Sequence, residues 1–67
     1  MKLRELLEVV PGITSVTIHI QGRLNDRSYL FVSDIEQDLY GYEVLSVSVD
    51  YCNMNYLFIM IGEAFND

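Results

Sequence analysis

Four short segments of this chain consist largely of apolar residues spaced for a β-strand, and they limit what it can fold into. The segments at residues 16–20 (VTIHI) and 45–49 (LSVSV) are apolar at every second position, which is typical of a strand with one buried face. The segments at residues 29–32 (YLFV) and 56–61 (YLFIMI) are apolar at every position. Both faces of those strands need cover, so the pattern predicts a sheet that one layer of helix does not conceal.

A helix is expected before the first strand. Leu3, Leu6, Leu7 and Val10 lie at the i, i+3, i+4 and i+7 spacing of one helical stripe, and Pro11 ends the pattern. The sequence therefore predicts a helix over residues 2–10 that packs its leucines on the sheet.

A second, short helix is expected in the middle of the chain, over residues 34–40. Ser33 and Glu36 have the spacing of a capping box, and Gly41 can close the helix. Strands are predicted at residues 13–21, 27–32, 42–51 and 56–61, with a turn at 52–55 and a frayed tail at 63–67.

These elements fit one small α+β domain over residues 1–67, with the order α-β-β-α-β-β. We expect a mostly antiparallel four-stranded sheet, with the N-terminal helix packed on one face and the short helix between two hairpins. A chain of this size buries only about 60% of the surface that its unfolded form exposes. Its hydrophobic share of 51% is therefore high, which favours a folded chain that associates with itself or with a partner.

The charge is negative and unevenly distributed. The net charge is −6, and all four basic residues lie within the first 27 positions. Direct nucleic-acid binding is not expected, because such binding depends on cationic contacts to phosphate. Five acids in the second half are candidates for an acidic surface: Asp34, Glu36, Asp38, Glu43 and Asp50. An alternative function follows, that of an acidic inhibitor or nucleic-acid mimic that binds the basic groove of a host protein.

The sequence offers no set of residues for catalysis or metal binding. Asp34, Glu36 and Asp38 alternate as at the start of a calcium loop, but the glycine and glutamate that such a loop needs later are absent. His19 is the single histidine, and Cys52, the single cysteine, has no basic neighbour in the sequence. We therefore expect no enzyme activity, cofactor, metal or small-molecule substrate.

Cysteine use and hydropathy bear on the compartment. One cysteine cannot form an internal disulfide, and no apolar run approaches the ~18 residues of a membrane span. The expected location is the cytoplasm, without membrane contact.

The apolar strand surface is the candidate site. We expect Val16, Ile18, Ile20, Leu30, Val32, Leu45, Val47, Val49, Leu57, Ile59 and Ile61 to lie under the helix. Tyr29, Phe31, Tyr56, Phe58 and Met60 would then lie on the opposite face as partner-binding residues. Three alternatives stay open: the middle helix or the tail covers this face, a second copy covers it, or a different protein does. The predicted function is a non-catalytic protein-interaction module that self-associates.

The chain also resembles a group of known proteins in four stretches: residues 1–8 (MKLRELLE), 32–35 (VSDI), 42–47 (YEVLSV) and 57–61 (LFIMI). It is similar there to the short acidic proteins of unknown role that phages and conjugative transposons of Gram-positive bacteria carry. The resemblance implies a bacterial cytoplasm and an accessory role on a mobile genetic element. It implies no functional residue.

Overall fold

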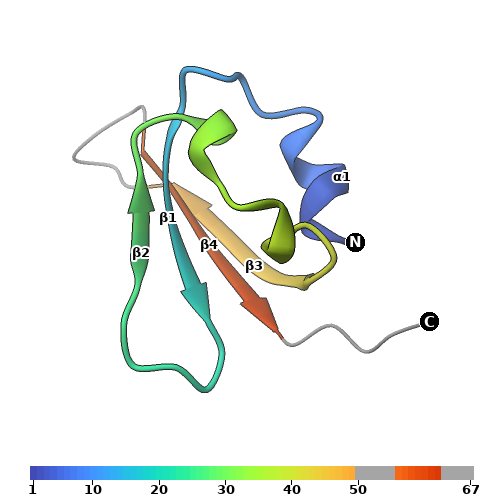
Figure 1. Ribbon diagram of the computed structural model, residues 1–67, viewed down its shortest axis with the longest axis vertical. Coiled ribbons are helices and arrows are strands. Elements are labelled where there is room, and N and C mark those ends of the chain that lie inside the picture. The colour runs from blue at the N-terminus through green and yellow to red at the C-terminus, as the bar shows by residue number, and fades with distance from the viewer. Residues whose placement is uncertain (50–55, 63–67) are drawn as a thin grey trace.

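The structure of the protein is a computed structural model that describes residues 1–49 and 56–62, without the side chain of Tyr56. It is a small α+β fold with one N-terminal helix and a four-stranded mixed sheet (Figure 1). In chain order the elements are α1 (Leu3–Leu7), β1 (Ser15–Ile20), β2 (Arg27–Tyr29), two 3-10 turns η1 (Val32–Asp34) and η2 (Gln37–Leu39), β3 (Glu43–Val49) and β4 (Tyr56–Gly62).

The sheet has the strand order β2-β1-β4-β3. β1 pairs with β2 and β3 pairs with β4, both antiparallel, whereas β1 and β4 are parallel. The parallel register runs from Ser15 opposite Tyr56 to Ile20 opposite Ile61. The sheet is therefore mostly antiparallel, as predicted, but its two central strands come from distant parts of the sequence.

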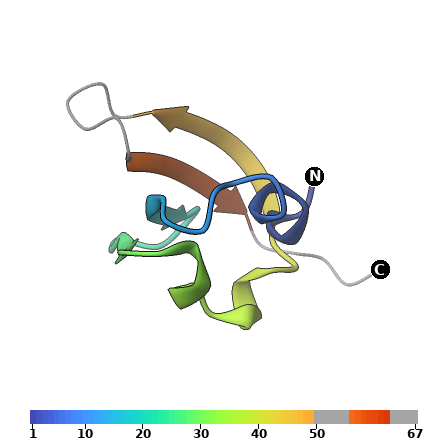
Figure 2. The same cartoon turned by 90° about the horizontal axis from the view of Figure 1, so that it is seen from above.

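The covering elements all lie on one side of the sheet. In Figure 2 the sheet curves, and α1 and the two 3-10 turns lie on its inner side. We call this the covered face and the other the outer face. The core forms on the covered face from nine buried side chains: Leu3, Val16, Ile18, Ile20, Val32, Ile35, Leu39, Ile59 and Ile61. The alternation in β1 and the apolar run of β4 thus place their isoleucines as predicted.

The middle connection corrects one prediction, because residues 34–40 form no α-helix. The chain makes η1, passes through Ile35 in an extended conformation (φ −70°, ψ 130°) and then makes η2. This path buries Ile35 and Leu39 together with Val32. No Ser33–Glu36 capping box forms: the carboxylate of Asp34 accepts a hydrogen bond of 3.3 Å from the backbone N–H of Phe31. The predicted arrangement of two hairpins around a helix is thus not confirmed.

Several predicted elements are shorter in the structure. The helix ends at Leu7 rather than residue 10, although Leu6, Leu7 and Val10 still pack against the core. β2 ends at Tyr29, and Leu30 is exposed instead of buried under the helix. The predicted turn at 52–55 and the tail at 63–67 lie outside the described residues. In the part of the chain that is described, no helix has the length and apolarity to cross a membrane.

Candidate functional site

The five aromatic and methionine candidates do not share one face. Tyr29 lies opposite Val16 in the β1–β2 register, and it is half-buried against the core on the covered face. This corrects its expected position on the far side of the sheet. The pattern predicts the opposite phase for β2, and the register with β1 shows that this phase is wrong.

Phe31 lies beyond β2, at the end of the sheet, where it is exposed. Exposed Leu30 and Ile13 lie at the same end, because Val32 N–H donates to the Gly12 carbonyl and Ser15 Oγ donates to the Leu30 carbonyl. Phe31 therefore belongs to a group of loop residues rather than to a sheet face.

Phe58 and Met60 do lie on the outer face. Their register partners on β1 are Thr17 and His19, and on β3 Ser48 and Ser46. Tyr56 lies opposite Ser15, but its side chain is outside the described residues. Phe58 and Met60 are themselves half-buried. The described side chains of the outer face are thus a mixture of polar and apolar residues, and Phe58 is the one predicted aromatic residue among them.

A β-bulge changes which β3 residues face the core. Val44 lies opposite Ile61 and Ser46 opposite Met60, which leaves Leu45 as the extra residue. An extra residue reverses the phase of the strand. Val44 consequently packs against the core, whereas Leu45 lies over Gly62, with its Cδ1 3.1 Å from where a Cβ on Gly62 would stand.

The rest of β3 is exposed and carries no charge. Leu45, Val47 and Val49 retain 47%, 43% and 49% of their accessible surface. Val47 and Val49 lie on the covered face, opposite Ile59 and Leu57, but at its margin. With Ser46 and Ser48 between them, these residues carry no charge. We call residues 45–49 the β3 edge segment.

The edge of β3 that faces away from β4 is hydrogen-bonded to other backbone over only part of its length. At its start, Leu3 N–H donates to the Tyr42 carbonyl (2.8 Å) and Val44 N–H donates to the Met1 carbonyl (2.9 Å). Lys2 forms an isolated antiparallel bridge with Glu43 there. Past Val44, no backbone group of another described element bonds to this side of the strand. Within residues 1–49 and 56–62, the β3 edge segment therefore has backbone donors and acceptors without a backbone partner, beside apolar side chains.

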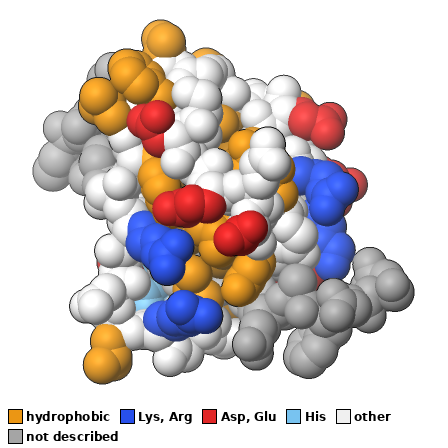
Figure 3. Space-filling view, viewed as in Figure 1, with side chains coloured by type: hydrophobic (Ala, Val, Ile, Leu, Met, Phe, Trp, Pro, Cys, Tyr) orange, Lys and Arg blue, Asp and Glu red, His pale blue; other side chains and the backbone are white. Residues whose placement is uncertain are grey.

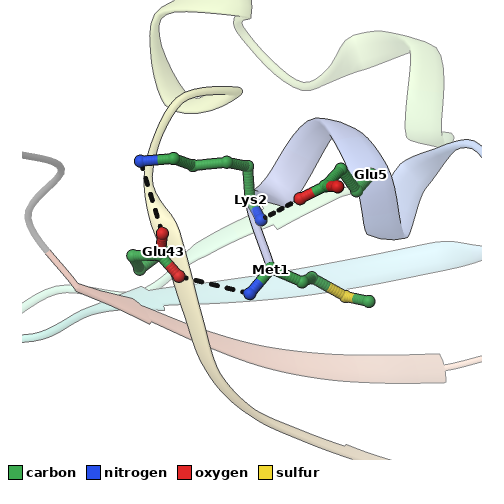
Figure 4. A network of polar contacts seen from close by, with 4 residues as sticks. All are labelled: Met1, Lys2, Glu5 and Glu43. Carbon is green, nitrogen blue, oxygen red and sulfur yellow. Dashed lines mark hydrogen bonds and ion pairs between the residues drawn. The ribbon is translucent and has the colours of Figure 1, made fainter. Parts of the chain in front are cut away.

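Ion pairs fix the occupied part of the edge (Figure 4). The carboxylate of Glu43 accepts a hydrogen bond from the α-amino group of Met1 (3.2 Å) and contacts Lys2 Nζ at 3.3 Å. These two cations, the α-amino group first, hold the pKa of Glu43 below its ordinary value. The backbone N–H of Lys2 donates to the carboxylate of Glu5 at 2.7 Å, which ties the same segment to α1.

The opposite edge of the sheet, formed by β2, differs from the β3 edge in length and in charge. β2 has only three residues, and exposed Arg27 is one of them. Short, charged edge strands are the usual protection against pairing with another chain. β3 is longer and uncharged after Glu43, so it lacks the protection that β2 has.

The acidic candidates do not form a uniform acidic surface. Asp34, Glu36 and Asp38 are exposed on the 3-10 turns. Figure 3 shows acidic and basic side chains next to one another on this side of the molecule. Arg27 Nη1 lies 3.7 Å from the carboxylate of Glu36. Glu43 is engaged as described above, and Asp50 lies outside the described residues.

Glu36 also contacts the sheet through Tyr29. The Tyr29 hydroxyl donates a hydrogen bond of 2.5 Å to the Glu36 carboxylate. Burial first, and then this bond, raise the pKa of Tyr29, while the same bond lowers the pKa of Glu36. The contact joins the 3-10 turns to β2, so the Tyr29 hydroxyl helps to hold the fold together.

Among the described polar residues, the single histidine is paired with a carboxylate. His19 Nδ1 lies 2.6 Å from the Asp26 carboxylate, at the β1–β2 connection. Within residues 1–49 and 56–62, no three His, Cys, Asp or Glu side chains gather as a metal site would require. Cys52 lies outside those ranges.

Comparison of the chain with protein-family models, with curated proteins and with solved structures gave no match.

The alternation predicts that Leu45, Val47 and Val49 lie under the helix, whereas all three are exposed in the structure. One signal was present in the sequence: no charged residue occurs from Val44 to Val49. That signal alone does not separate a central strand from an edge strand, since the strand order decides which of the two it is.

Proposed function

We propose that this protein is a non-catalytic protein-interaction module that docks a partner strand along the β3 edge segment. The observation that carries the proposal is a stretch of open strand edge with three exposed apolar side chains and no charge. An extended chain gains main-chain hydrogen bonds from such an edge, and alternate side chains then contact the apolar residues beside it.

The remaining surface supports this choice of site. Of the exposed apolar side chains elsewhere, Leu24 and Val9 stand singly, in a loop and after the helix. Ile13, Leu30 and Phe31 gather at one end of the sheet, but they lie in loops outside the strands. Single exposed apolar residues are normal on protein surfaces and need no partner. On β3 they occur together with unpaired backbone groups, so two independent features favour the same place.

The resemblance to short acidic proteins of phages and conjugative transposons supports a proposal about where the protein acts. The module would act in a bacterial cytoplasm as an accessory of a mobile element. Genes for integration or transfer next to its own gene are the expected finding.

Site-specific photo-crosslinking in living cells tests the docking function. A photoreactive phenylalanine analogue replaces Ser48, in the β3 edge segment, or Ser33, an exposed residue of η1 that serves as the matched control. We expect a discrete adduct from position 48 and none from position 33. Equal, diffuse labelling from both positions would overturn the proposed docking site.

A further inference from the structure

We propose that the partner strand on the β3 edge segment is the same segment of a second copy of this chain, paired antiparallel about a two-fold axis. This identification of the partner rests on the docking function proposed above. It follows from the symmetry, the apolar continuity and the charge of residues 46–49.

The alternation in this segment is self-complementary. A two-fold axis perpendicular to the sheet pairs two antiparallel strands so that residues on the same face meet one another. Val47 and Val49 share the covered face, and Ser46 and Ser48 share the outer face. Any register of this symmetry therefore sets valine against valine and serine against serine.

The valines continue the core across such an interface. Val47 lies opposite Ile59 and Val49 opposite Leu57, yet about half of the accessible surface of each valine stays exposed. The valines of a second copy would cover that exposed surface and extend the apolar layer from one protomer into the next. Cross-strand pairs of β-branched residues stabilise sheets in this way.

Charge favours this contact over other contacts between copies. The chain carries a net charge of −6, so two copies repel each other on average. The segment from Val44 to Val49 has no charged residue, and like charges do not face each other across it. Glu43, the nearest described acid, is neutralised by Met1 and Lys2 of its own chain.

The occupied part of the edge limits the extent of pairing. Met1 and Leu3 already hydrogen-bond to Val44 and Tyr42, and the bulge at Leu45 interrupts regular pairing. Within the described residues this leaves 46–49 as the pairing region. The outcome is one continuous sheet through both protomers, with a short, apolar junction at its centre.

Sedimentation velocity over a concentration series tests the partner's identity, with two variants of the full chain. Val47→Lys puts a charge into the proposed junction, and Leu24→Lys makes the same change at a loop residue that is 98% exposed. We expect wild type and L24K to dimerise alike, and V47K to weaken the dimer at least about tenfold. Circular dichroism verifies that both variants are folded.

Amide hydrogen exchange locates the contact independently. In wild type, we expect the protection of the Val47 and Val49 amides from exchange to rise with protein concentration. In V47K, the protection of the Val49 amide should not change with concentration. A wild type that is still a monomer at about 1 mM overturns the second copy as partner. A dimer that V47K leaves intact, or whose protection rises elsewhere, overturns this edge as the interface.

These outcomes separate this inference from the docking function. A monomer in solution together with a position-48 adduct to another protein would reject self-pairing and retain the docking site. A monomer with no position-specific adduct would reject both.

Discussion

Leu45 packs over Gly62, and its Cδ1 stands 3.1 Å from the position that a Cβ on Gly62 would take. The β-bulge in β3 brings them together, since it turns Leu45 away from the core to the outer face. The backbone of Gly62 is not in the left-handed region. The three nearest atoms that the Cβ of an alanine would meet there all belong to the Leu45 side chain.

A double-mutant cycle measures this contact. In a Leu45→Ala background, Gly62→Ala should raise the free energy of unfolding by about 0.4–1 kcal/mol, because alanine restricts the unfolded chain. In wild type the gain should be smaller or reversed, since Leu45 must move. Urea unfolding of the four proteins gives the coupling energy. Equal effects in both backgrounds would contradict the close packing.

The Tyr29–Glu36 contact predicts a loss of stability at alkaline pH. Burial and the hydrogen bond to Glu36 raise the pKa of Tyr29 above 10.0 in the folded protein. The stability from the neutral phenol is complete below pH 10.0 and is lost as the pH rises through the folded-state pKa. Tyr29→Phe should make unfolding less pH-dependent in this range, as measured by denaturant melts. Tyr42→Phe, at another half-buried tyrosine, is the control.

The Glu43 contacts predict a loss of stability in acid. The α-amino group and Lys2 lower the pKa of Glu43 from 4.5 in the folded protein. The stabilisation is therefore present above pH 4.5 and is lost as the pH falls through the folded-state pKa. Glu43→Gln should flatten the stability profile below this pH, whereas exposed Glu8→Gln should not. High salt should reduce the difference, because exposed ion pairs are screened.

The anchoring of α1 depends on Leu3, which is fully buried. Leu3→Ala should lower the free energy of unfolding by about 2–5 kcal/mol, through lost burial and the cavity that remains. Val9→Ala, at an exposed position after the helix, should stay within about 0.5 kcal/mol of wild type. Thermal and urea melts measure both. A mild Leu3 variant would mean that the helix adds little to the core.

The sequence predicted the buried residues where the pattern is local. Val16, Ile18 and Ile20 are buried as their alternation indicates, and Ile59 and Ile61 lie beside them. Leu3 was likewise expected on the packed stripe of the helix, and its burial is confirmed. The positions in β1 and in the helix depend only on the period of the element that carries them.

The candidate site could not be predicted in the same way. The alternation of residues 45–49 predicts one face for Leu45, Val47 and Val49, whereas the bulge leaves the two valines on the covered face and turns Leu45 to the outer face. The capping signal at Ser33 is local, whereas the observed path, with extended Ile35 between two 3-10 turns, buries Ile35 in a core made by distant elements. The position of β3 at the sheet edge depends on the parallel pairing of β1 with β4.

That parallel pairing also constrains the order in which the molecule can assemble. β1 is an inner strand, and one whole side of its backbone remains without partners until β4 arrives. Closing a loop of this length costs entropy before any contact is gained, and such topologies fold slowly. A nascent chain that ends before Ile61 would expose Val16, Ile18 and Ile20 to other molecules. Removal of β4 should therefore abolish the folded state instead of leaving a smaller stable unit.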